Sequence, residues 1–227
     1  KSSAPEVFSP PLSPESAKRF GTANGIVQFL KKYRQDMLVA ARATGTVVKN
    51  PTEYDERVMK RLIRYLKGTK NLGQWFPADC GGLDCIVGNG DTDWAKDTTT
   101  RKSVVCGIVQ VGGCTILAFS RGQIVTAHSS TEAEYYCQCS VAVEMLLCRR
   151  VFDWLGYPMR MDLECDSTGA IGVAHRQGVG RIKQLEIKTL WLQEFVNGGG
   201  SEQMVQKKVN ILDMKADIGT KIHDAKR

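Results

Sequence analysis

The chain has 227 residues, of which 42% are apolar and 7% aromatic, so it can bury a hydrophobic core and fold as one or two domains. This apolar content excludes a wholly disordered chain, and no apolar run approaches the roughly 20 residues that a membrane-spanning helix needs. The net charge of +7 is uneven, because residues 1–76 hold 14 Lys and Arg against 6 Asp and Glu, whereas residues 77–227 hold 17 against 18.

The first residue is Lys1 and no signal peptide follows it, so we expect a soluble piece of a longer protein. The eight cysteines are scattered, and several fall inside apolar runs such as residues 103–111. We therefore expect reduced, buried thiols rather than a disulfide scaffold. A structural zinc site is not expected, because the sequence offers only Cys137-x-Cys139 and three scattered histidines.

The first third of the chain is predicted to be helical after a short lead-in. Residues 1–14 carry four prolines without apolar periodicity, which predicts a disordered linker. The apolar pattern of residues 15–49 predicts a helix. Asn50-Pro51-Thr52 then ends this helix and starts another at residues 52–67, since proline suits the first helical turn.

One face of the second predicted helix carries Arg57, Lys60, Arg61 and Arg64 at helical spacing. A solvated charged face is the ordinary interpretation of such a pattern. These cations have no interleaved acid and lie in the basic third of the chain, so we predict instead that they contact a phosphate backbone.

From residue 77 onward the pattern predicts alternating strands and helices. The first three strands are short β-branched runs at residues 83–90, 103–111 and 114–120, which predict an antiparallel meander. A long helix follows at residues 129–155, opened by a capping box formed by Ser129 and Glu132. The remaining elements are a fourth strand at 159–165, helices at 167–175 and 183–196, a last strand at 203–209 and a short helix from about residue 212.

Four acids stand where the predicted elements begin or end. Asp91 directly follows the first strand and Asp166 the fourth, whereas Glu134 lies in the first turns of the long helix and Asp217 on the last helix. If the first and fourth strands are neighbours, Asp91 and Asp166 lie together, and their repulsion requires a hard divalent cation with oxygen ligands. Magnesium pairs in such sites perform in-line phosphodiester chemistry. Taken singly, each acid is better interpreted as an ordinary surface or cap residue.

Four stretches of the sequence together resemble one known family. GDTDWA at residues 90–95 with TRKS at 100–103, SSTEAEY at 129–135, CDS at 165–167 and KADIGTK at 215–221 resemble, in this order, the motifs of the copia-type retrotransposon ribonuclease H. Residues 50–53 and 62–70 are similar to the segment that joins reverse transcriptase to ribonuclease H in these polyproteins. The resemblance covers about residues 35–221.

The resemblance implies an α/β, ribonuclease H-like fold with a five-stranded mixed sheet flanked by helices and preceded by a small helical segment. Strands one to three are expected to be antiparallel, and strands four and five parallel to strand one. Three parts of the chain are implied: a disordered linker at 1–14, a helical remnant of the reverse transcriptase at 15–76 and a ribonuclease H domain at 77–227.

The family's catalytic acids and metal ligands correspond to Asp91, Glu134, Asp166 and Asp217. The implied activity is endonucleolytic hydrolysis of the RNA strand of RNA/DNA hybrids, with two Mg²⁺ ions, or Mn²⁺, as cofactors. The implied partners are the hybrid and the reverse transcriptase core of the same polyprotein, in a cytoplasmic particle or the nucleus. Contacts to nucleic acid are expected from Arg57, Lys60, Arg61, Arg64, Arg101, Lys102, Ser130 and Lys183.

Two further acids are not assigned to the metal. Asp93 is expected at the rim with its side chain pointing away from that of Asp91, and Glu132 is expected to serve the helix N-terminus. The sequence also departs from the family, since Gln184 replaces a histidine and so cannot shuttle protons. Gly219 replaces a leucine and is expected to loosen the last helix by roughly 0.5 to 1 kcal/mol.

Two alternatives follow from these departures and from the shared sheet. One is a catalytically decayed module that still binds nucleic acid but no longer cleaves it. The other is an integrase, which usually needs a zinc-binding His/Cys segment that this sequence does not offer. The retention of all four acids favours the ribonuclease.

Overall fold

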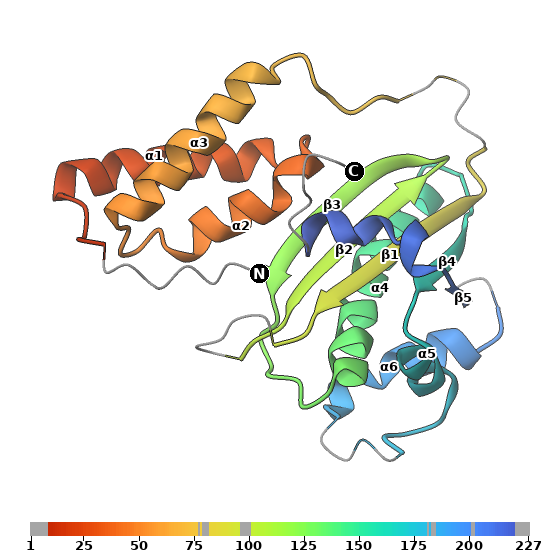
Figure 1. Ribbon diagram of the computed structural model, residues 1–227. Coiled ribbons are helices and arrows are strands. Elements are labelled where there is room, and N and C mark those ends of the chain that lie inside the picture. Colours follow the sequence, from red (N-terminus) through yellow and green to blue (C-terminus); the bar gives the residue numbers. More distant parts are fainter. Residues whose placement is uncertain are drawn as a thin grey trace. The chain divides into compact units, whose positions relative to one another are not determined.

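The computed structural model describes residues 9–76, 78, 82–95, 101–180, 182, 185–200 and 203–220. The chain divides into two compact units, residues 1–74 and residues 75–227 (Figure 1). Among the helices of the described residues, none is both long and apolar enough to cross a membrane.

The first unit consists of helices. Its elements are α1 (Pro14–Leu30), the 3₁₀ turn η1 (Gln35–Met37), α2 (Leu38–Thr46) and α3 (Glu53–Gly68). The single helix expected at residues 15–49 is therefore wrong. The break after Leu30 lets α2 fold back, so that Phe20 and Val27 of α1 share one core with Ala41 of α2 and Leu62 of α3. One straight helix could not close such a core.

The lead-in to α1 is partly ordered, which corrects the linker expected at residues 1–14. The Leu12 amide donates to the Pro51 carbonyl at 3.0 Å, and the Glu53 amide donates to the Pro10 carbonyl at 3.0 Å. The Leu12 side chain also packs against the core of this unit. A proline lacks an amide proton but keeps its carbonyl, so a proline-rich strand can still pair on one side. Residues 1–8 lie outside the described residues.

The second unit is built on one five-stranded sheet. Its strands are β1 (Cys85–Asp93), β2 (Val104–Val111), β3 (Cys114–Gly122), β4 (Arg160–Cys165) and β5 (Met204–Lys208), in the order β3-β2-β1-β4-β5. The pairs β1–β2 and β2–β3 are antiparallel, whereas β1–β4 and β4–β5 are parallel. The mixed sheet predicted from the sequence is thus confirmed.

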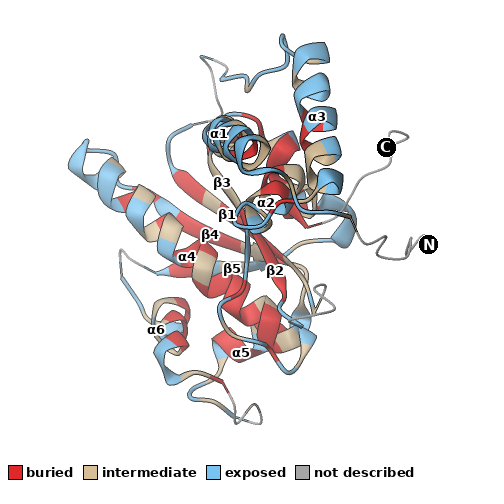
Figure 2. Ribbon diagram, turned by 90° about the vertical axis from the view of Figure 1, so that its left-hand side faces the viewer, coloured by how far each residue is buried: buried red, intermediate tan, exposed pale blue. Residues whose placement is uncertain are grey.

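Helices α4 (Ser130–Trp154), α5 (Thr168–His175) and α6 (Trp191–Asn197) belong to the same unit. Buried residues concentrate in the sheet and on the helix faces that turn toward it (Figure 2). The close approach of α4 to β1 needs glycine, because a Cβ on Gly88 would lie 2.2 Å from the Met145 sulfur. Larger side chains at this crossing would push α4 off the sheet.

The helices expected at residues 183–196 and from about residue 212 are shorter than predicted. The first reduces to a 3₁₀ turn, η2 (Ile187–Thr189), followed by α6. The second consists of two 3₁₀ turns, η3 (Ile211–Asp213) and η4 (Lys215–Gly219). Tertiary contacts decide this outcome, since Met214 and Ala216 are buried and η4 lies against β1 and β2.

The start of α4 departs slightly from the predicted capping box. The Glu132 amide donates to the Ser129 hydroxyl at 3.2 Å, as expected. The Glu132 carboxylate accepts instead from the His128 amide at 2.9 Å and from the Tyr136 hydroxyl at 3.0 Å. Glu132 is 1% exposed and therefore holds the helix N-terminus from inside the fold.

The cysteines of the described residues are all free thiols, and all but the half-buried Cys148 are buried. The expectation of reduced core thiols is confirmed for them. Cys80 lies outside the described residues.

Candidate active site

Asp91 lies inside β1 rather than after it, which corrects the prediction. It pairs with Cys106 of β2, and the ladder continues for two more residues to Asp93. Gly90 faces α4, because a Cβ there would lie 3.0 Å from the Cys137 sulfur. Side chains alternate along a strand, so Asp91 projects from the opposite face of the sheet. Asp91 is only 4% exposed, and its Oδ2 accepts a hydrogen bond from the Thr220 hydroxyl.

Asp93 also corrects an expectation. It pairs with Val104 at the end of β1 and is half-buried. Residues two apart in a strand project from the same face. Asp93 therefore shares the face of Asp91 and does not point away from it.

Glu134 and Asp166 lie together. The parallel register of β1 and β4 ends with Asn89 opposite Glu164. Two residues later come Asp91, still on β1, and Asp166, the first residue after β4. A carboxylate oxygen of Glu134, one of Asp166 and the Cys165 sulfur all lie within 4.8 Å of one another. Both acids are half-buried. Among the described residues, this is the group of side chains that could hold a metal ion.

The chemistry of this group favours a hard cation. Burial, together with the charges of Glu134 and Asp166, raises the pKa of the Cys165 thiol to about 12. The thiol therefore stays protonated at neutral pH, and it accepts a hydrogen bond from the Gln138 amide at 3.0 Å. The donors that remain are carboxylate oxygens, which suit Mg²⁺ or Mn²⁺ rather than a thiolate-bound zinc.

Asp217 lies in η4, on the side of the sheet opposite α4 (Figure 1). The Ser120 hydroxyl donates to the Gly219 carbonyl at 2.6 Å. A Cβ on Gly219 would lie 2.3 Å from the Cys106 sulfur, so only glycine lets η4 approach β2 this closely. The expectation that Gly219 merely loosens the last helix is therefore wrong.

The charges of the four acids act on three buried thiols, Cys106, Cys137 and Cys165. Burial is the main cause that raises the pKa of each thiol, and the charges of two acids add to it. These pairs are Asp91 and Asp217 at Cys106, Glu134 and Asp91 at Cys137, and Glu134 and Asp166 at Cys165. Each of these thiols is therefore influenced by the charges of two of the four acids. Within the described part of the chain, Glu134 and Asp166 belong to the group that could hold a metal ion. The Thr220 hydroxyl lies between the other two acids, bonded to Asp91 Oδ2 and 3.4 Å from the Asp217 carbonyl.

The cations predicted on α3 are exposed. Lys60 forms an ion pair with Glu56, the residue before the first of these cations, at 2.9 Å. No acid lies between Arg57 and Arg64 in the sequence, as expected. Arg57 lies over the Tyr54 ring, with 5.9 Å between the guanidinium carbon and the ring centroid.

The other predicted nucleic-acid contacts lie in the second unit. Arg101, Lys102 and Ser130 are exposed, and Arg101 has a positive φ of 56°. Lys183 and Gln184 lie outside the described residues.

Sequence reasoning missed two residues of the site, Cys165 and Thr220. Both stand inside the quoted motifs, next to Asp166 and three residues after Asp217. A motif match was therefore the signal that could have found them.

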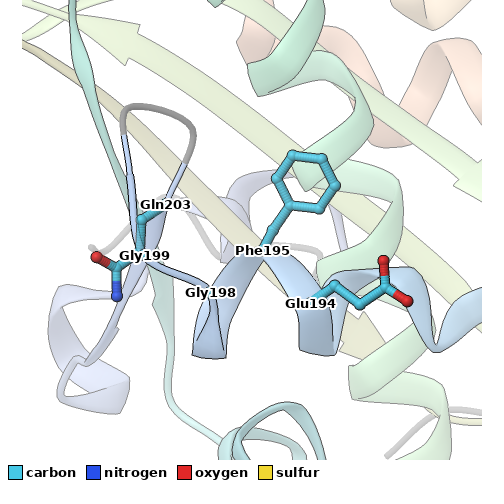
Figure 3. A pocket seen from close by; sticks show the side chains of 5 residues that line it. All are labelled: Glu194, Phe195, Gly198, Gly199 and Gln203. Carbon is cyan, nitrogen blue, oxygen red and sulfur yellow. The ribbon is translucent and has the colours of Figure 1, made fainter.

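A separate hollow at the end of α6 is lined by Glu194, Phe195, Gly198, Gly199 and Gln203 (Figure 3). It contains none of the four acids.

The sequence matches no protein-family model. It is 29% identical over 195 residues to the retrovirus-related Pol polyprotein from transposon TNT 1-94 of Nicotiana tabacum, covering 83% of this chain and 14% of that protein. It is also 29% identical over 200 residues to the retrovirus-related Pol polyprotein from transposon RE1 of Arabidopsis thaliana, covering 87% and 13%. The chain is a homologue of copia-type retrotransposon Pol polyproteins.

Two solved structures are similar to this chain. The N-terminal RNase H domain of a Mycobacterium tuberculosis protein has a TM-score of 0.39 at 13% identity, covering 59% of this chain and 88% of that one. The prototype foamy virus protease-reverse transcriptase has a TM-score of 0.42 at 12% identity, covering 66% and 22%. The fold is ribonuclease H-like, as the strand order and register described above establish.

Proposed function

We propose that this chain is a metal-dependent ribonuclease H that cleaves the RNA strand of RNA/DNA hybrids during reverse transcription. One observation carries the proposal. Among the acids that match the copia-type motifs, Glu134 and Asp166 have carboxylate oxygens within 4.8 Å of one another. Because like charges this close repel, the arrangement suits a bound cation.

The residues of the site fit two magnesium ions by their donor chemistry. Glu134 and Asp166 would hold one side of the metal site, and Asp91 and Asp217 the other. Bound magnesium would supply Lewis-acid activation of a water molecule and stabilisation of the leaving oxygen. The acids lie on β1, α4 and η4 and directly after β4, and all of these elements belong to one packed unit.

The proposed reaction is hydrolysis of one phosphodiester bond. A bond forms between a water oxygen and phosphorus while the bond from phosphorus to the 3′ oxygen breaks, and the attacking water releases one proton to solvent. The products are a 5′-phosphate and a 3′-hydroxyl, so the 3′ oxygen must take up a proton. Gln184 cannot supply this proton because its amide does not titrate, and we expect the proton to come from solvent.

Substrate recognition would rest on shape. RNA is distinguished from DNA by its 2′-hydroxyls, and proteins reach these across the wide minor groove of the hybrid. Arg101, Lys102 and Ser130 are exposed, and we assign them, with Lys183 and the cations of α3, to backbone contacts. The chain spans about one seventh of its Pol relatives, and the reverse transcriptase core of the same polyprotein is a proposed partner within the cell.

The test is cleavage of an end-labelled RNA/DNA hybrid. Wild-type protein with Mg²⁺ should cut the RNA strand and leave double-stranded DNA intact. Both Asp91→Asn and chelation of the metal should reduce cleavage at least about 100-fold, since one ligand or the cation itself is removed. If the wild-type protein binds the hybrid but never cuts it with Mg²⁺ or Mn²⁺, the chain is instead a decayed nucleic-acid-binding module.

A further inference from the structure

Thr220 stands at the junction of two of the acids. Its side chain is fully buried, at 0% exposure, and its hydroxyl donates to Oδ2 of Asp91. Its backbone amide donates to the Asp217 carbonyl at 3.2 Å, and the same carbonyl lies 3.4 Å from the hydroxyl. A threonine hydroxyl has one proton, so the nearer carboxylate of Asp91 takes it.

Other contacts already hold η4 on the sheet. The Ser120 hydroxyl bonds the Gly219 carbonyl at 2.6 Å, and the Lys215 ammonium bonds the Gln110 side chain at 2.6 Å. Met214 and Ala216 add buried apolar area, at 4% and 0% exposure. These contacts hold η4 on the sheet without the Thr220 hydroxyl. The bond from this hydroxyl to Asp91 is therefore not needed to fix η4 in place.

We propose that Thr220 is a positioning residue, which orients the Asp91 carboxylate for the metal and ties it to the segment that carries Asp217. This inference rests on the proposed function. A hydrogen bond to a carboxylate is charge-assisted and directional. By bonding Oδ2, the Thr220 hydroxyl fixes the plane of the Asp91 carboxylate. Groups that orient metal ligands in this way typically contribute roughly 10- to 100-fold to metal affinity or activity.

The experiment compares Thr220→Val, which keeps the shape but removes the hydroxyl, with Thr220→Ser, which keeps the hydroxyl. Binding of Mn²⁺ alone is measured by titration calorimetry, and hybrid cleavage is measured in parallel. Thr220→Val should weaken Mn²⁺ binding and slow cleavage by about 10-fold or more, whereas Thr220→Ser should stay near wild type. Thr220→Ala is a second hydroxyl-free variant for use if valine prevents folding, which circular dichroism reports.

Two controls separate positioning from simple stability. Ser120→Ala removes the other hydroxyl that bonds η4 but touches none of the acids, so it should lower stability without changing Mn²⁺ affinity. In an Asp91→Asn background, Thr220→Val should cause no further loss of Mn²⁺ affinity, because the two residues act through one bond.

The outcomes distinguish this inference from the proposed function. If the wild-type protein binds no Mn²⁺ and cuts no hybrid, both fail. If the wild-type protein does both and folded Thr220→Val does so equally well, only the role of Thr220 is overturned. An equal loss of Mn²⁺ affinity in Ser120→Ala and Thr220→Val would also overturn it, because the effect would then come from the seating of η4.

Discussion

Glu134 and Asp166 are 32 positions apart in the sequence, yet their carboxylates come within 4.8 Å of one another. Neither side chain is fully exposed, so water screens their repulsion only in part. Such crowding destabilises the metal-free protein and is relieved when a cation binds. At the scale of single residues, the proposed metal site would therefore lower the stability of the metal-free protein.

Replacing Asp166 by Asn should stabilise the metal-free protein. The expected gain is about 1 kcal/mol in the free energy of unfolding, which is the repulsion of two unit charges about 4 Å apart in water. Urea unfolding in the presence of a chelator measures it, and addition of Mg²⁺ should stabilise the wild type more than the variant. Asp213→Asn, an exposed acid on η3, is the matched control and should change little. A less stable Asp166→Asn protein would contradict the repulsion.

At the scale of elements, η4 shows how a short segment without a regular helix can be held in place. Five residues in 3₁₀ conformation provide few hydrogen bonds of their own. The segment is held instead by tertiary contacts, which are the close packing of Gly219 against Cys106 and the hydrogen bond from the Ser120 hydroxyl. Because Gly219 has no side chain, η4, which carries Asp217, packs closely against Cys106 of β2.

We expect Gly219→Ala to destabilise the protein by roughly 1 to 3 kcal/mol, because the added Cβ would overlap the side chain of Cys106. Gly172→Ala in α5 is the matched control. A Cβ there meets nothing within 4 Å, so the same change should stabilise the helix by roughly 0.4 to 1 kcal/mol. Urea unfolding of both variants measures the difference. Equal effects of the two substitutions would show that η4 is not seated as described.

The cationic face of α3 supports a second prediction at this scale. Arg61→Ala combined with Arg64→Ala should weaken binding to hybrids of any sequence, because phosphate contacts do not distinguish bases. Each lost contact should also flatten the slope of log affinity against log salt by roughly 0.7 to 0.9. Affinity measured at several salt concentrations tests this.

The matched control for the α3 variant is Lys18→Ala with Arg19→Ala in α1, which removes the same charge from exposed positions of the same unit. This control should leave the slope unchanged. An unchanged slope in the α3 variant as well would mean that its cationic face is a solvated or protein-facing surface.

At the scale of the whole molecule, buried thiols make stability depend on alkaline pH. Burial raises the pKa of Cys106, Cys139 and Cys165 from 9.0 to about 12. Above pH 9 the unfolded chain loses these protons while the folded protein keeps them, so the unfolded state is favoured as pH rises. Stability from these thiols is fully present below pH 9 and is lost as pH rises towards 12.

The free energy of unfolding should therefore stay level from about pH 7 to 8 and fall above pH 9, by about 1.4 kcal/mol per pH unit for each thiol. Urea unfolding at a series of pH values measures the slope. Cys139→Ala should reduce this slope by about 1.4 kcal/mol per pH unit, the contribution of one thiol. Cys148→Ala, at a less buried position, should reduce the slope less. A slope that neither substitution changes would assign the alkaline loss to other groups.

Local patterns in the sequence determined the order of the elements. The mixed sheet and the identity of the candidate acids came from the resemblance of four motifs to the copia-type family. Apolar periodicity, caps and turn residues act between neighbours in the chain, so they can be read without a structure. The side of the sheet on which Asp91 projects and the 3₁₀ form of η4 were decided only by tertiary structure. The Ser120 hydroxyl donates to the Gly219 carbonyl across 99 positions, and no local pattern records so distant a contact. The break after Leu30 has the same origin, because only the closed core of the first unit shows why one helix had to become two.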